Sequence, residues 1–490
     1  MTASFGKLRA FFWPIHRVEL KKFIPLFFIY FLITFNYNLL RIFKDSLLVT
    51  APNSGAEALP FVKVWAVLPM AILFTMFFTW LSNRVSREKV FYVMISIFIS
   101  FFLIFVTFLY PCRDLLHPHA LANSLEAILP SGFKGLIVLL RNWTFTLCYV
   151  MSDLWSSVIL SVLFWGFANE VTKIDEAKRF YGVLMIGSNF SGVLSGQASV
   201  LFSKIPFIAG ISYGTNSWDQ CVFFMNFLVI LVGCVTIFLF RRLNQRVIRK
   251  ETPLTTDDKP KMSFREQIAY LAKSKYLCCI AFIVLSYNLV MNLVEVVWKN
   301  QMKQLYPDPT VYNTYMGEVL TATSVIATLT ALLVTSNVIR RYSWTVAALI
   351  PAVITFVTGV FFFFFALFSK NIPLLGLSPL FLCVTFGSMQ NCFARASKYT
   401  LFDATTNLAF IPLESDVKLK GKAAIDGIGS RLGKSGGSVI HQGFLLLFTT
   451  ISASMPYIGV IFLVAVGIWI FSVKSLGKKF NQLTESPVSA

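Results

Sequence analysis

Six ionisable residues stand inside long apolar stretches of this sequence, where a charge is expensive. They are Lys63, Arg141, Asp153, Glu295, Arg431 and Lys434. An ionised group inside a membrane costs about 3 kcal/mol or more unless it is paired or faces a wet cavity, so such residues mark candidate sites. Four of the six are basic and two are acidic. This positive surplus predicts a polyanionic ligand and no metal site, since a site for a metal cation would have the opposite sign.

Most of these charges also have a structural interpretation. Lys63 could extend its stem to the membrane interface, and Arg141 could be an interfacial residue or the structural partner of another group. The side chain of Asp153 is too short to reach an interface, so its structural alternative is a salt bridge between helices. Glu295 could form an ion pair along one helix with Lys299, four residues later.

Arg431 and Lys434 are three residues apart, so two cations share one face of a predicted helix. An anion between them would relieve their repulsion, whereas the structural alternative is a basic cluster at the inner interface. The surrounding GSRLGKS string is similar to the phosphate-binding loop of ATPases. That loop needs a glycine five residues before Gly433, where Ile428 stands, and a preceding strand. The sequence therefore predicts no ATPase and no catalytic residues.

The composition identifies the elements that must hold these charges. Of the 490 residues, 56% are hydrophobic and only 13% are charged, whereas about a quarter are charged in soluble domains. A soluble enzyme is thereby excluded. The net charge of +20 could indicate nucleic-acid binding. However, 31 of the 43 basic residues fall on segments predicted to lie on one side of a membrane and 8 on the other. This bias predicts cytoplasmic termini and no nucleic-acid partner.

We therefore predict an all-α polytopic membrane protein with twelve transmembrane helices. A spanning helix needs about 20 mostly apolar residues. The stretches that meet this requirement are 23–41, 60–82, 90–110, 136–168, 180–203, 219–240, 277–298, 317–339, 343–368, 373–394, 423–450 and 455–474.

The longest polar segment, 241–276, divides these helices into two sets of six. We predict an N-terminal bundle over 23–240 and a C-terminal bundle over 277–474, with cytoplasmic segments at 1–22 and 475–490. Short echoes link the two halves, because YNLL at 37–40 is similar to YNLV at 287–290, and IGS at 186–188 recurs at 428–430. Such parallel repeats are typical of major-facilitator-like transporters, whose substrate site lies between the halves.

Several uncommon strings give the chain a specific resemblance over almost its whole length. They are KDSLLVTAP, AEALPFVKVW, RNWTFTLCYVMSDLWSS, SVLFWGFANEVTKIDEAKRFY, NLVEVVWK and KGKAAIDGIGSRLGKSGG. In these strings the chain resembles the ATP/ADP translocases of chlamydia-like and rickettsial bacteria and of plastids. The resemblance implies twelve helices and four charged positions important for transport, two Lys and two Glu. They correspond to Lys63, Asp153, Glu295 and Lys434.

Three positions depart from the family pattern. Asp153 replaces a Glu, which shortens the carboxylate by one methylene, and Ser156 replaces the Gly of the ELWGS string. The string RIFKD at 41–45 lacks the acid that follows the Arg in the typical RDTKD. Because exchangers usually keep these residues, the departures bear on ADP exchange and on adenine preference.

The resemblance implies a monomeric multi-pass nucleotide transporter in the inner membrane of an intracellular bacterium. It would import ATP or other nucleoside triphosphates in exchange for ADP. Proton-coupled import without exchange is the alternative. Lys63, Lys434, Arg431 and Arg141 are expected to bind phosphate. Asp153 and Glu295 would pair with these cations when the site is empty. No cofactor is expected.

Overall fold

The computed structural model describes residues 14–246, 274–332, 343–368, 376–413, 417, 421–422, 425 and 430–485, which are almost entirely helical. Within these residues, eight helices are long and apolar enough to cross a membrane. Four more polar helices, α11, α15, α18 and α21, accompany them with lengths of 31, 22, 19 and 19 residues. The all-α membrane fold is thus confirmed, while the number of twelve crossings stays a prediction.

The N-terminal half consists of long helices, several of them assembled from consecutive shorter elements. In chain order they are α2 (Leu20–Val49), α3 (Ala58–Phe61), η2 (Val62–Val67), α4 (Leu68–Ser82), α5 (Arg87–Ile104), η3 (Phe105–Leu109), α6 (Arg113–Leu116), α7 (His119–Ile128), α8 (Lys134–Arg141), α9 (Trp143–Leu154), η5 (Trp155–Phe164), α10 (Trp165–Val171), α11 (Ile174–Lys204) and α12 (Ser217–Arg246).

The C-terminal half repeats this long-helix pattern. It comprises α14 (Lys275–Leu305), α15 (Pro309–Thr330), α17 (Trp344–Phe368), α18 (Pro379–Ser397), η9 (Lys398–Phe402), α19 (Asp403–Leu408), α21 (Ser430–Phe448) and α22 (Ile451–Glu485). Most of the predicted 241–276 linker, residues 247–273, lies outside the described residues.

Several helix boundaries differ from the prediction; α14 and α22, for example, continue past their predicted ends to Leu305 and Glu485. The first helix was expected to end at residue 41, but α2 continues to Val49. The predicted 136–168 stretch is broken, because Asn142 adopts a non-helical conformation (φ −108°, ψ 49°) between α8 and α9. The helix predicted for 373–394 extends instead through α18, η9 and α19 to Leu408. Each difference moves charged residues relative to the apolar segments.

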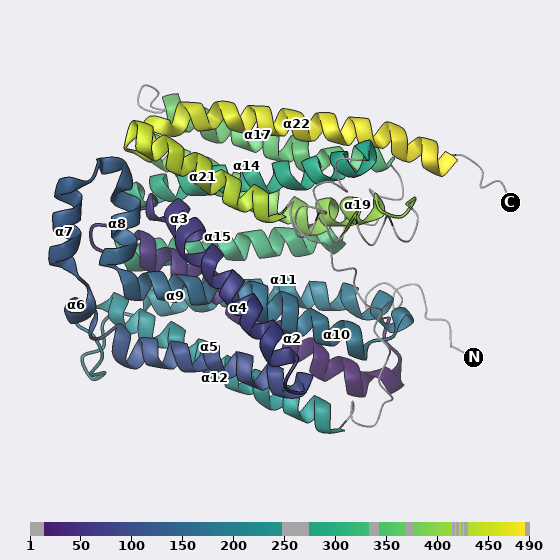
Figure 1. Cartoon of the computed structure of the whole chain (residues 1–490), viewed down its shortest axis with the longest axis horizontal. Coiled ribbons are helices and arrows are strands. Elements are labelled where there is room, and N and C mark those ends of the chain that lie inside the picture. The colour runs from purple at the N-terminus through teal and green to yellow at the C-terminus, as the bar shows by residue number, and fades with distance from the viewer. Residues whose placement is uncertain are drawn as a thin grey trace.

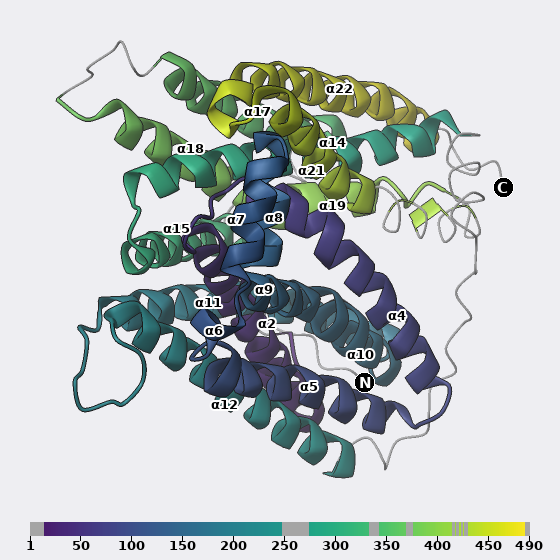
Figure 2. The same ribbon diagram turned by 60° about the vertical axis from the view of Figure 1, so that its left-hand side comes forward.

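The two halves form two bundles lying side by side (Figures 1 and 2). The hairpin of α7 and α8 lies at one end, which we call the hairpin end, and both chain termini lie at the other, the terminal end. Between the bundles α11 packs on α15, and an added Cβ on Gly317 would lie 2.8 Å from the carbonyl oxygen of Gly196. Small residues therefore let the two backbones approach closely.

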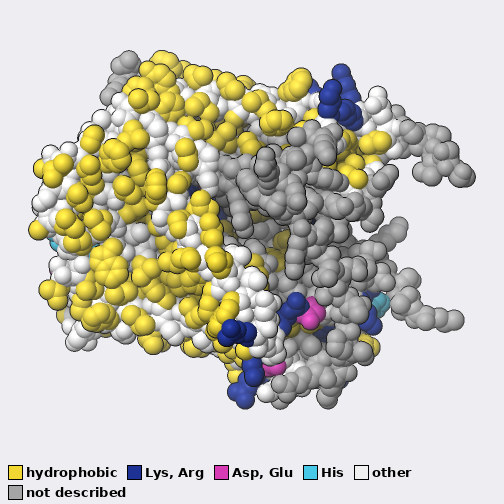
Figure 3. Space-filling model, in the orientation of Figure 1, with side chains coloured by type: hydrophobic (Ala, Val, Ile, Leu, Met, Phe, Trp, Pro, Cys, Tyr) yellow, Lys and Arg dark blue, Asp and Glu magenta, His cyan; other side chains and the backbone are white. Residues whose placement is uncertain are grey.

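Apolar side chains cover most of the described surface facing the viewer in Figure 3, while charged side chains gather towards the terminal end. Helix α4 contributes strongly to this surface, with Trp65 just before it and Met76 and Trp80 within it all exposed. Such a belt would aggregate in water but is stable in lipid.

The described helices contain wide, π-type turns at η2, η3, η5 and η9. Three of these turns lie beside a charged residue: Lys63 is within η2, Asp153 precedes η5 by two positions, and Lys398 begins η9. Turns of this kind are rare and often occur at functional sites. They draw attention to the region where the three helices face the middle of the molecule.

Candidate functional site

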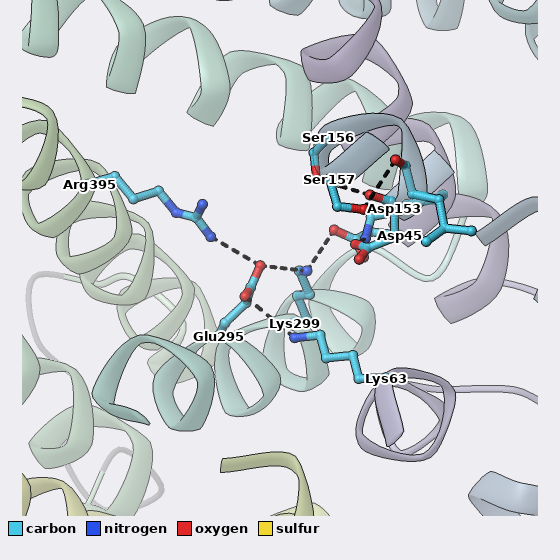
Figure 4. Close-up of polar contacts among 10 residues, drawn as sticks. Asp45, Lys63, Asp153, Ser156, Ser157, Glu295, Lys299 and Arg395 are labelled. Carbon is cyan, nitrogen blue, oxygen red and sulfur yellow. Dashed lines mark hydrogen bonds and ion pairs between the residues drawn. The ribbon is translucent and has the colours of Figure 1, made fainter. Parts of the chain in front are cut away.

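Glu295 on α14 is the centre of an ion cluster between the two bundles (Figure 4). Its Oε1 lies 2.8 Å from Lys299 Nζ and 3.1 Å from Arg395 Nη2, and its Oε2 lies 3.8 Å from Lys63 Nζ. Lys63 comes from η2 of the N-terminal bundle, whereas Arg395 comes from α18. One carboxylate thus holds cations from both halves.

Lys299 extends this network into a sealed region. Its Nζ donates to Asp45 Oδ2 at 2.7 Å as well as to Glu295. The side chains of Lys299 and Asp45 are only 2% and 3% exposed, whereas those of Lys63, Glu295 and Arg395 are 16–21% exposed. A ligand can therefore reach Lys63, Glu295 and Arg395 but not the buried pair of Lys299 and Asp45. We call these five residues the central cluster.

A second ion pair, Lys44 with Asp153, lies beside the central cluster (Figure 4). Lys44 Nζ also stands over the ring of Tyr149, 4.0 Å from its centre, which adds a cation–π contact. The Asp153 carboxylate remains 39% exposed. Ser156, at the position where the family has Gly, donates its hydroxyl to the Asp153 carbonyl oxygen at 2.9 Å. The hydroxyl therefore binds backbone and leaves the carboxylate accessible.

A small pocket opens beside Glu295. It has room for about 30 Å³, and its polar lining comes from Arg41, Glu295, Thr323, Asn391 and Arg395. Arg41 on α2 is partly exposed. With Arg41 included, the central cluster has four basic side chains against two carboxylates, a surplus of two positive charges. Within the part of the chain that the structure describes, no group of His, Cys, Asp and Glu could hold a metal ion.

Of the residues proposed from the sequence, Lys63 and Glu295 are in direct contact, and Asp153 is nearby. Arg141 is elsewhere. At the end of α8, its guanidinium lies 2.8 Å from Glu126 and donates to Asn123 at 2.8 Å, both on α7. The hairpin thus uses the Arg141 charge to join its own two helices.

Arg431 and Lys434 belong to α21, but their side chains lie outside the described residues. The helix that carries them packs tightly on α14. An added Cβ on Gly433 would lie 2.6 Å from Asn288 Cβ, and one on Gly437 would lie 2.8 Å from Asn292 Oδ1. The backbone of α21 therefore lies directly against the helix that carries Glu295.

Sequence reasoning missed Arg41, Lys44, Asp45 and Arg395 as site residues, and it considered Lys299 only as a structural ion-pair partner of Glu295. The error follows from the helix ends, since α2 was expected to stop at residue 41 and the tenth helix at 394. The density of charge in RIFKD at 41–45, within a chain only 13% charged, was the available signal.

Comparison with known proteins places this geometry in context. The family described as TLC ATP/ADP transporter matches residues 1–480. ADP,ATP carrier protein 1 of Chlamydia trachomatis is 43% identical over 486 residues, 97% of this chain and 92% of that protein. The chloroplastic ADP,ATP carrier protein 1 of Arabidopsis thaliana is 42% identical over 468 residues, 95% of this chain and 75% of that protein.

Solved structures agree on the fold. A bacterial homologue of the iron transporter ferroportin in an inward-facing state has a TM-score of 0.60 at 13% identity, covering 94% of this chain and all of that one. The D-xylose–proton symporter has a TM-score of 0.55 at 12% identity, covering 93% of this chain and 97% of that one. The major-facilitator-like fold is thereby confirmed. From the match over 480 residues and the relatives above 40% identity, this chain belongs to the TLC ATP/ADP transporter family.

Proposed function

We propose that this protein is a nucleotide exchanger that imports ATP in return for ADP across a bacterial inner membrane. The hairpin end would face the periplasm and the terminal end, with both termini, the cytoplasm. The observation that carries the proposal is the accessible, net-positive cluster around Glu295 at the contact between the bundles. The family and its ADP,ATP carriers supply the substrate, and they favour exchange over proton-coupled import.

Lys63 is the cation best placed to change partners. Its 3.8 Å separation from Glu295 is long for an ion pair, whereas Lys299 holds the same carboxylate at 2.8 Å. A phosphate can therefore take Lys63 without first breaking a short hydrogen bond, and such charge-assisted contacts are strong. Lys434 and Arg431 on α21 would contribute further phosphate contacts. Asp153 would hold Lys44 when the site is empty.

Contacts that join the bundles gather towards the hairpin end. Lys303 donates to the carbonyl oxygen of Ser54, Gln442 Nε2 donates to that of Pro60 at 2.9 Å, and Trp65 Nε1 donates to Gln442 Oε1 at 3.0 Å. Alternating access would break these contacts and form others at the terminal end. Exchange of ion partners at Glu295 supplies the differential affinity that couples substrate to this change.

Uptake by proteoliposomes tests the proposal. The purified full-length chain is reconstituted, and labelled ATP is supplied outside vesicles that are empty or loaded with ADP, with and without a protonophore. We expect uptake that requires internal ADP and is insensitive to the protonophore. Uptake that needs a proton gradient and no internal nucleotide would contradict exchange. ATP hydrolysis without transport would contradict the transporter itself.

Variants then test the site. Lys63→Gln should lower kcat/KM for ATP about tenfold to a hundredfold, since hydrogen bonds to charged groups are worth about 1.5–3 kcal/mol. Glu295→Gln should lower both KM and kcat. Substrate should bind more tightly because no carboxylate competes with its phosphates for Lys63, and it should leave more slowly because no carboxylate takes the place of the departing phosphate. Arg84→Gln is the control, because Arg84 is exposed, stacks on Trp80 and forms no ion pair with the described residues. Normal ATP uptake by both site variants would refute the assignment.

A further inference from the structure

Arg41 is a basic residue of α2 that forms no direct hydrogen bond or ion pair with the described residues. It lies eight residues before the end of α2 at Val49 and lines the pocket beside Glu295. Its neighbours on the same helix differ, because Lys44 pairs with Asp153 and Asp45 with Lys299. A guanidinium within a membrane-spanning helix that no carboxylate contacts directly is costly, and such a group is normally retained for a ligand or a wet cavity.

Arg395 faces the same pocket and uses only part of its donor capacity. Its Nη2 contacts Glu295 Oε1 at 3.1 Å, and no further hydrogen bond of its guanidinium occurs among the described residues. A guanidinium offers five N–H donors in a planar fork. Arg41 comes from α2 and Arg395 from α18, so the two bundles each bring one fork to the pocket.

We propose that Arg41 and Arg395 form a second phosphate-binding site that takes the terminal phosphoryl group of the nucleoside polyphosphate. The inference rests on the proposed function and deepens it. Paired N–H donors of a guanidinium match two phosphoryl oxygens, a geometry that a Lys point charge does not provide. Arg395 and Lys63 lie on opposite sides of Glu295 (Figure 4). A phosphate chain that displaces the Glu295 carboxylate therefore meets Lys63 on one side and the two arginines on the other.

The volume of the pocket shows that a phosphoryl group can bind only if a side chain moves. Its 30 Å³ holds one water molecule but no phosphoryl group. Binding therefore requires the Glu295 carboxylate to leave Arg395, and the phosphoryl group takes its place. A single phosphoryl group that replaces the Glu295 carboxylate must share its oxygens between Lys63 and Arg395, as that carboxylate does. A phosphate chain can instead give Lys63 and the arginine pair a phosphoryl group each, so the pair favours di- and triphosphates over monophosphates.

Inhibition of labelled ATP uptake by tripolyphosphate and by AMP tests this assignment in the reconstituted full-length chain. Arg41→Gln and Arg395→Gln should each raise the inhibitory constant of tripolyphosphate and the KM for ATP about tenfold or more. The inhibitory constant of AMP should change less than threefold. Arg41→Lys should recover only part of the loss, because the fork is missing. Arg84→Gln again serves as the matched control.

The two variants guard against a purely structural explanation. Arg395→Gln removes a contact of Glu295, but Arg41→Gln breaks no hydrogen bond or ion pair of the described residues. Unchanged tripolyphosphate inhibition in Arg41→Gln, or an equal loss for AMP, would overturn the site. If the wild-type chain took up no nucleotide, the proposed function would fail instead. Calorimetric binding of tripolyphosphate to purified wild type and Arg41→Gln would then decide the arginine site alone.

Discussion

Removal of the Asp45 charge should open the hairpin end. Asp45 Oδ2 and Lys299 Nζ are 2.7 Å apart, almost fully buried, and belong to α2 and α14 of different bundles. Loss of one partner of a buried ion pair costs about 3–5 kcal/mol. Because Lys299 keeps its ion pair with Glu295 at 2.8 Å, we expect Asp45→Asn to destabilise the closed hairpin end by only about 1–3 kcal/mol. This change shifts the equilibrium between the closed and open hairpin end by a factor of about 5–150.

Double electron–electron resonance, which measures the distance between two spin labels, detects this shift. Spin labels at Ser212 and Val311, exposed positions before α12 and in the first turn of α15, report the separation of the bundles at the hairpin end. Asp45→Asn should add a longer-distance population that the unsubstituted chain lacks. Glu126→Gln is the control, because it removes an ion pair of Arg141 within one bundle and should leave the distances unchanged. Identical distances in Asp45→Asn and wild type would refute the idea that this pair closes the hairpin end.

Two further predictions concern stability in detergent. Gly317→Ala should lower the free energy of unfolding by about 1–3 kcal/mol and lower the Tm, because the added Cβ would lie 2.8 Å from the Gly196 carbonyl oxygen. Gly166→Ala is the control and should be neutral or stabilising, because an added Cβ there has no neighbour within 4 Å. Equal Tm values for the two variants would count against close packing of α11 on α15. Burial lowers the pKa of His117, which bonds Thr144 at 2.7 Å near the hairpin, from 6.5 to about 4. Since the unfolded chain binds this proton first, stability should be complete above pH 6.5 and fall as the pH drops towards 4; His117→Gln should reduce that dependence, and an unchanged pH profile would argue against it.

The sequence predicted the fold well because membrane helices are defined locally. Apolar length and the bias of basic residues are properties of single segments, so the all-α membrane class required no tertiary information. Lys63 and Glu295 could be singled out for the same reason, as isolated charges in apolar runs. Their contact is now seen at 3.8 Å, while their role in binding stays a proposal.

The missed residues depend on distant partners. The helix was expected to stop at residue 41 because Lys44 and Asp45 resemble an interfacial end. It continues because Lys299, 254 positions from Asp45, neutralises that carboxylate inside the protein. Arg395 is likewise held within α18 by Glu295, 100 positions away. Pairings over such separations leave no periodic pattern in one sequence.

The wide turns beside the charged residues have a mechanical consequence. Each of η2, η5 and η9 contains more residues per turn than a regular α-helix. When a wide turn tightens to α-helical winding and its spare residue passes along the helix, the segment between the old and the new position of the wide turn rotates by about 100°. Lys63 and Lys398 sit on such turns. These helices can therefore swivel a charge out of the centre of the protein while their ends stay fixed in the membrane, a motion separate from any rocking of the two bundles.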